Sequence, residues 1–145
     1  MGFIRNAILD ASNATHCAVV QLNDEESVRI RNCVEEKYAA GIGQLPLWER
    51  LKSDFSKYDP EGWRVISDFP FDNRVTMFFD RESEANMYSI SSCKEAVKIL
   101  SECPGFVFYI TDEGCSFLLC HNDHDYLIGA GSAKDWIGRE EKGTD

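Results

Sequence analysis

The sequence predicts a single α+β domain, in which helices pack on a mainly antiparallel sheet of about five to six strands. Its 145 residues match the usual size of one domain, and 43% of them are hydrophobic, which is enough for one packed core. Apolar residues recur at helical spacing before Gly62, whereas after it they alternate or form short continuous runs. Short turns separate the later runs, and strands joined by short turns pair antiparallel.

The first part of the chain, residues 1–60, is predicted to be helical. Three amphipathic patterns, each with its own start and stop signals, cover residues 3–11, 24–40 and 46–58. Asn23 or Asp24 is a suitable N-cap for the second helix, and Pro46 suits the first position of the third. Residues 17–22 form a brief apolar run that fits either an edge strand or an extended connector.

The sheet is predicted within residues 62–138, and residues 139–145 are predicted to form a loose, charged tail. Six apolar runs bounded by turn residues read as strands: 63–69, 75–79, 87–90, 106–111, 117–120 and 126–130. Ser92 and Glu95 form a capping box for a helix between the third and fourth strands, and Ser132 caps a last short helix. The predicted order is three helices, three strands, one helix, three strands and one helix, with the helices on one face of the sheet.

The segment from residue 106 to residue 136 dominates the predicted sheet. Residues 106–111 are almost continuously apolar, so this strand is predicted to be central and covered on both faces. No Lys or Arg occurs from Ile99 through Ala133, and the net charge of the chain is -10. Such a surface repels nucleic acids and anionic membranes and attracts basic proteins, although acidity for solubility alone explains the same charge.

Cys, His and Asp residues are dense near the last turn of the predicted sheet: Cys115, Cys120, His121, Asp123, His124 and Asp125. Zinc binds thiolates and imidazoles, but strand alternation is expected to place Cys115 and Cys120 on opposite faces, so no metal or other cofactor is predicted. An alternative is a small hydrolase or metal-dependent enzyme, with a histidine as base and an aspartate orienting it. Tight turns favour Asp and Asn for local reasons as well.

The composition also favours a cytoplasmic protein with reduced thiols. No apolar run approaches the roughly 20 residues that span a bilayer. Arg5 and Asp10 lie where a signal peptide would be uninterruptedly apolar. The six cysteines are therefore predicted to be mostly buried, small hydrophobic residues rather than a disulfide framework.

Four segments of the later half carry a resemblance in general layout: residues 63–69 (WRVISDF), 77–79 (MFF), 125–128 (DYLI) and 133–136 (AKDW). In this layout the chain resembles small uncharacterised bacterial proteins, some of them similar to immunity proteins of contact-dependent inhibition and other polymorphic toxin systems. The resemblance covers the chain from Trp63 onward. It implies a non-enzymatic inhibitor of a toxin and supplies no functional residue.

Acidity and this resemblance together lead to the hypothesis of an immunity protein that masks the active site of a basic toxin, a nuclease being one such toxin. Six residues are predicted to contact the partner, the acids by charge complementarity and the aromatic residues as anchors: Asp112, Glu113, Asp123, Asp125, Tyr126 and Trp136. No catalytic residue is predicted in this hypothesis. An adaptor or regulatory subunit is a further alternative that uses the same physics with a different partner.

Overall fold

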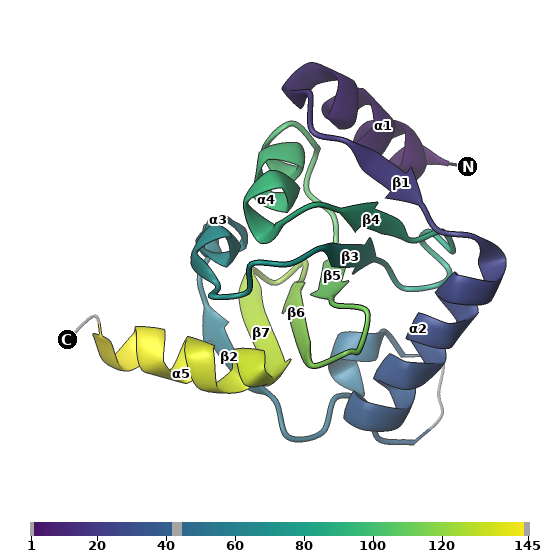
Figure 1. Cartoon of the computed structure of the whole chain (residues 1–145). Helices are drawn as coiled ribbons and strands as arrows, with labels where there is room; N and C mark the ends of the chain where they lie inside the picture. Colours follow the sequence, from purple (N-terminus) through teal and green to yellow (C-terminus); the bar gives the residue numbers. More distant parts are fainter. Residues whose placement is uncertain (1, 42–44, 144–145) are drawn as a thin grey trace.

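Seven strands form one antiparallel sheet in the computed structural model, which describes residues 2–41 and 45–143, with side chains up to residue 139 (Figure 1). The strands are β1 (Val19–Gln21), β2 (Phe55–Tyr58), β3 (Val75–Phe78), β4 (Tyr88–Ile90), β5 (Phe108–Thr111), β6 (Phe117–His121) and β7 (Tyr126–Gly131). Their order is β1-β4-β3-β5-β6-β7-β2. The α+β class is confirmed, and the sheet has more strands than predicted because β1 and β2 add an edge strand on each side.

The four main helices are α1 (Phe3–Thr15), α2 (Asp24–Tyr38), α4 (Cys93–Ser101) and α5 (Ser132–Gly143). Two of them, α2 and α4, begin directly after the capping residues that were predicted for them, and α5 begins at the predicted cap Ser132 itself. The side chain of Asn23 accepts a hydrogen bond from the Glu26 amide, and that of Ser92 accepts one from the Glu95 amide. The last helix continues to Gly143, so most of the predicted tail is helical, and Thr144 and Asp145 lie outside the described residues. Within the described parts of the chain, residues 2–41 and 45–143, no helix is long and apolar enough to cross a bilayer.

The predicted helix over residues 46–58 is wrong, and with it the prediction that residues 1–60 are wholly helical. Only a short 3-10 turn, η1 (Leu47–Glu49), is helical there. The positive φ of Ser53, 58°, interrupts the helical path, and β2 then alternates between half-buried and exposed residues beside β7. Phe55 and Tyr58 are three residues apart, which fits a helix by spacing alone. The open alternative for residues 17–22 is decided in favour of an edge strand, β1.

The strand predicted over residues 63–69 is also wrong, because this segment forms the helical turn α3 (Gly62–Val65) and the 3-10 turn η2 (Ile66–Asp68). Trp63, Ile66 and Phe69 recur every third residue, which is the period of a 3-10 helix. Ile66 and Phe69 are buried in the core, and Trp63 packs against it. The first of the four segments that carry the layout resemblance is therefore not the strand that was predicted.

Helices cover both faces of the sheet, in contrast to the single covered face that was predicted. The helices α1, α4 and α5 pack on one face, and α2 packs on the other (Figure 1). The first face presents Met77, Ile110 and Leu119, and the second presents Phe78, Tyr109 and Leu118. The central position of β5 is confirmed, since every residue of β3, β5 and β6 is buried. Strands that are apolar on both faces need cover on both.

Gly131, at the end of β7, is expected to tolerate no side chain. Its φ is 64°, and a Cβ there would lie 2.6 Å from the Ser116 carbonyl oxygen and 2.7 Å from the Tyr38 hydroxyl. Gly131→Ala is therefore expected to lower the free energy of unfolding by about 2 kcal/mol or more, measured by urea denaturation. Gly138→Ala is the matched control, because α5 offers open space there and a helix favours Ala. Equal effects of the two substitutions would contradict this reading.

Candidate functional site

The four predicted acids lie at opposite ends of β6. Asp112 and Glu113 belong to the turn between β5 and β6, whereas Asp123 and Asp125 belong to the turn between β6 and β7. A five-residue strand separates the two turns by about 15 Å. The prediction that these acids share one docking face is therefore wrong, because closeness in sequence across a strand means opposite ends of the sheet.

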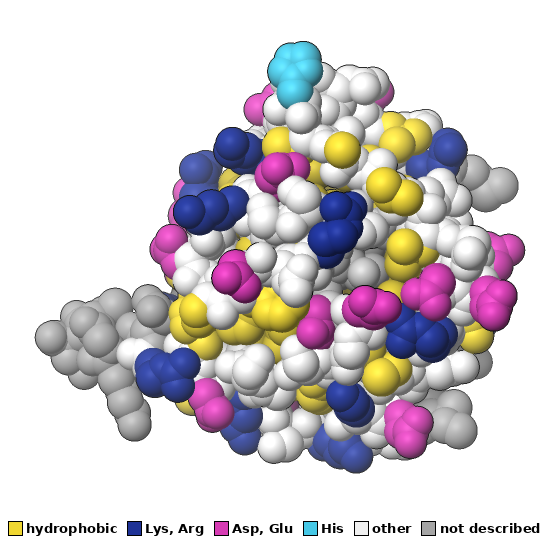
Figure 2. Space-filling model, viewed as in Figure 1, with side chains coloured by type: hydrophobic (Ala, Val, Ile, Leu, Met, Phe, Trp, Pro, Cys, Tyr) yellow, Lys and Arg dark blue, Asp and Glu magenta, His cyan; other side chains and the backbone are white. Residues whose placement is uncertain are grey.

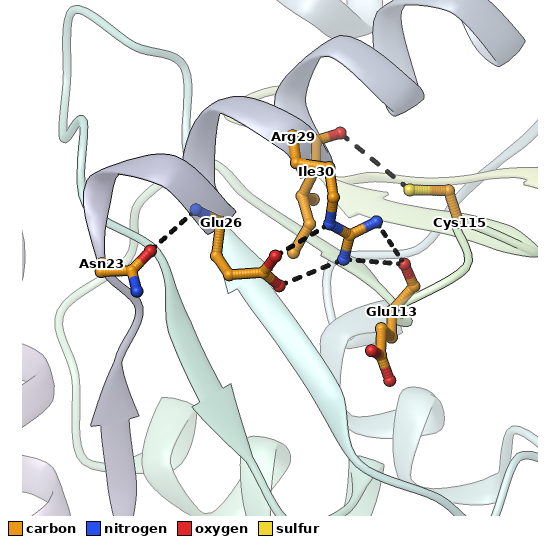
Figure 3. Close-up of polar contacts among 6 residues, drawn as sticks. All are labelled: Asn23, Glu26, Arg29, Ile30, Glu113 and Cys115. Atoms are coloured by element: carbon orange, nitrogen blue, oxygen red, sulfur yellow. Dashed lines mark hydrogen bonds and ion pairs between the residues drawn. The ribbon is translucent and has the colours of Figure 1, made fainter.

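Bases from α2 hold the turn that contains Asp112 and Glu113 (Figure 3). Arg29 donates to the Glu113 carbonyl oxygen at 3.2 Å and pairs with Glu26 at 3.0 Å. Lys37 donates to the carbonyl oxygen of Gly114 at 2.9 Å. In the folded protein, basic side chains of α2 therefore lie beside a segment that contains no Lys or Arg of its own. Acidic side chains lie among basic ones on the face shown in Figure 2.

Trp136 is part of the core and not an exposed anchor, which corrects the prediction for this residue. Only 4% of it is exposed, and its ring centroid lies 5.1 Å from that of Phe69. Ala133, Trp136 and Ile137 form the apolar stripe of α5 that packs on the sheet. The charged neighbours that suggested an exposed end lie on the other side of the same helix.

The turn between β6 and β7 is closed by Asn122 and presents its other side chains to solvent. The buried Asn122 side chain accepts hydrogen bonds from the amides of His124 and Tyr126, both at 3.0 Å. Asp125 takes a positive φ, 64°, which Asp and Asn tolerate better than most residues. Local turn chemistry therefore accounts for these residues and leaves Asp123 and His124 exposed.

The two histidines of this turn lie on opposite faces of the sheet. His121 is buried, with its ring stacked on Phe108 and its Nε2 atom 2.9 Å from the Asp59 carbonyl oxygen. His124 packs edge-on against Trp48, with ring centroids 5.6 Å apart. Phe108 belongs to the core beneath α1, α4 and α5, whereas Trp48 packs against the core beneath α2. The fold does not bring the two imidazoles to one reaction centre.

Cys115 and Cys120 lie on the same side of the sheet, so the alternation argument was wrong for this pair. Both belong to the core beneath α2. Cys115 has a φ of 55° in the turn before β6, and strand alternation therefore does not extend to it. In the described part of the chain, no group of three or more His, Cys, Asp or Glu residues is placed to hold a metal ion. The predicted burial of most cysteines is confirmed for Cys17, Cys93, Cys115 and Cys120.

An aromatic face, made of Trp48, Tyr58, His124 and Tyr126, lies beside the turn between β6 and β7. Tyr58 is 61% exposed and Tyr126 is 39% exposed, and their rings meet edge-on at 5.6 Å across the β2–β7 pair. A shallow cavity of about 310 Å³ separates Tyr126 from Trp48 and His124, and Asp54 also lines it. No pattern in the sequence indicates Tyr58 for this role, because its segment fits a helix.

A partly buried hydrogen-bond network positions Trp48. The hydroxyl of Tyr109 donates to the Asp80 carboxylate at 2.9 Å and accepts a hydrogen bond from the Trp48 amide at 3.1 Å. The same carboxylate accepts a hydrogen bond from the Leu47 amide at 2.9 Å. Burial keeps the pKa of Tyr109 far above its usual value. The network fixes η1 to β5, so Trp48 is presented on a rigid support.

Comparison with protein-family models, curated proteins and solved structures finds no match for this chain. The functional reading therefore depends on the surface itself. Of the predicted contact residues, the fold brings Asp123, Asp125 and Tyr126 together at one end of the sheet. It adds Trp48 and Tyr58, which sequence reasoning missed, and His124, which was considered only as a catalytic or metal-binding residue.

Proposed function

We propose that this chain is an acidic, non-enzymatic binding protein of the bacterial cytoplasm, most specifically an immunity protein that neutralises a basic toxin by masking its active site. The observation that carries the proposal is the exposed aromatic face directly beside Asp123. Tyr and Trp dominate binding hot spots, and exposed carboxylates that are not held by basic side chains of the same protein steer a basic partner into place. A nuclease fits this role well, because a site that binds phosphate backbones is basic.

Charge supports the choice of this end of the sheet over the other. Asp123 is exposed, and the Nε2 atom of His124 approaches its carboxylate at 3.8 Å. The carboxylate is thus available to a partner, whereas Asp112 already accepts hydrogen bonds from the amide and hydroxyl of Ser116. The net charge of -10 adds attraction at long range.

Charge reversal at Asp123 is the direct test. Asp123→Lys is expected to weaken binding of the basic toxin partner, which is to be sought among toxin domains encoded in the genomic neighbourhood, by about tenfold at low salt, because it adds repulsion at the rim. Tyr126→Ala is expected to weaken it by a similar or larger factor through loss of an anchor. Affinities are measured by calorimetry after co-purification, and growth rescue of toxin-producing cells separates an immunity protein from a regulatory subunit.

Asp10→Lys is the matched control, because it makes the same change of net charge on an exposed residue of α1, a helix that packs on α4 and whose Arg5 side chain donates to Gln21 of the edge strand β1. Its affinity is expected to stay within about twofold of the unchanged protein. The proposal fails if no complex with that toxin domain survives at about 0.15 M salt. It also fails if both reversals weaken binding equally.

A further inference from the structure

A second cavity, of about 450 Å³, lies on the other side of the turn between β6 and β7. It opens between α3 and the loop that joins α4 to β5. Aromatic side chains of Trp63, Phe106, Phe108 and His121 line it, together with the acids Asp123 and Asp125. Its size is in the range of sites that bind small ligands or single side chains.

One nitrogen of the buried His121 has no partner in the described structure. The Asp59 carbonyl oxygen only accepts hydrogen bonds, so the Nε2 atom facing it at 2.9 Å carries the hydrogen. Nδ1 then holds the lone pair, and no hydrogen bond to it is found among the described residues. Gly62 lies against Cδ2, so Nδ1 is on the far edge of the ring from that glycine. Although His121 is only 7% exposed, it lines the cavity.

A guanidinium group of the chain itself already sits at the cavity rim. The guanidinium carbon of Arg64 is 4.6 Å from the centroid of the Trp63 ring, and both residues line the cavity. Arg64 is exposed and pairs with Glu61 at 3.2 Å. Trp63 therefore presents an aromatic face that attracts a planar cation.

We propose that this cavity binds a guanidinium group, supplied by an arginine side chain of the basic partner; this rests on the proposed function, which requires such a partner. The aromatic walls stack on a planar cation, the carboxylates of Asp123 and Asp125 neutralise it, and Nδ1 of His121 accepts one of its hydrogen bonds. Lysine fits less well, because a compact ammonium neither stacks nor donates in a plane. Anionic ligands are disfavoured by the two carboxylates.

The test titrates the ¹⁵N-labelled protein with N-acetyl-arginine amide and follows the Trp63 indole and His121 ring signals. Saturable shifts at these two residues are expected, with a dissociation constant of about 1 to 10 mM. The neutral isostere N-acetyl-citrulline amide is expected to bind at least about tenfold more weakly, and N-acetyl-lysine amide about threefold more weakly. Equal binding of the three probes, or shifts confined to other residues, overturns the proposal.

Variants locate the site without relying on a destabilised protein. Asp125→Asn, which keeps a residue suited to the positive φ, is expected to weaken arginine binding about threefold. Arg64→Ala removes the competing guanidinium and is expected to strengthen it about twofold. The control Asp10→Asn is expected to change nothing. Weaker binding in Arg64→Ala, or unchanged binding in Asp125→Asn, counts against the cavity.

The outcomes for this cavity and for the proposed function are separable. If the toxin domain binds but N-acetyl-arginine amide does not, the docking face stands and the arginine site is refuted. If the arginine probe binds at Trp63 and His121 but the toxin domain does not, the guanidinium site stands and the proposed function fails.

Discussion

Raising the pH from about 9 to about 11 in the presence of a reductant is expected to remove most of the folding free energy of this protein. Burial raises the pKa of Cys93 and of Cys103 to about 11, and burial together with Cys33 raises that of Cys115 to about 12. Burial also raises the pKa values of Tyr38 and Tyr88 to about 12. These groups stay neutral in the folded protein at a pH where they ionise in the unfolded chain.

The sign follows from which state loses protons first. Thiols of the unfolded chain ionise near their ordinary pKa of 9.0, whereas the folded protein holds them protonated. The stabilisation is complete below pH 9 and is lost as the pH rises toward the folded-state values. One pKa unit corresponds to about 1.4 kcal/mol, so Cys93 alone accounts for about 2 kcal/mol by pH 11. A few such groups rival the whole stability of a typical domain, about 5 to 15 kcal/mol.

Urea unfolding followed between pH 7 and pH 11 measures this loss. Cys93→Ala removes one titrating thiol and is expected to flatten the profile by about 1.4 kcal/mol per pH unit above pH 9. Its stability at pH 7 provides the baseline for the small cavity that it leaves. If the free energy of unfolding stays constant up to pH 11, the buried thiols and phenols ionise within the folded protein at their ordinary pKa values, and the prediction is refuted.

Trp136→Ala is expected to lower the free energy of unfolding by about 3 to 5 kcal/mol, because it empties the contact between α5 and the sheet. The ring is 4% exposed, packs against Phe69 and lies in the same core cluster as Ala133 and Ile137. Thermal and urea unfolding measure the loss. The fraction that remains folded is expected to bind the partner with unchanged affinity.

Trp48→Ala is the matched comparison, since it truncates an indole that is only half-buried and belongs to the aromatic face. The expected order is reversed: a smaller loss of stability, and a loss of partner affinity of about tenfold or more. If Trp136→Ala weakened binding by the folded protein more than Trp48→Ala did, the assignment of core and surface roles to the two indoles would be refuted.

Local signals in the sequence determined several elements correctly. Asn23 and Ser92 cap their helices because their side chains satisfy amides one turn ahead, a contact that depends on neighbouring residues alone. The continuous apolar run of β5 identified the central strand, because only a strand covered on both faces can bury every residue. The turn chemistry at Asn122 was likewise readable from residue type.

Long-range contacts decided what local spacing left ambiguous. Residues 55–58 fit a helix by spacing, and they became a strand because β7 offers them a ladder of hydrogen bonds. Residues 63–69 fit a strand by alternation, and they became helical turns with Ile66 in the core. Spacings of two and three residues overlap in short segments, so the pairing partner settles the outcome.

The composition of the candidate site was settled by tertiary structure in the same way. Sequence reasoning identified an acidic, strand-rich segment from residue 106 to residue 136 and placed Asp123 and Tyr126 in it. The fold moved Asp112 and Glu113 to the far end, buried Trp136, and brought Trp48 and Tyr58 beside the turn. Charge and turn chemistry are properties of neighbouring residues. A surface is assembled from segments that meet only when the edge strands have paired with the sheet and the helices have packed on its faces.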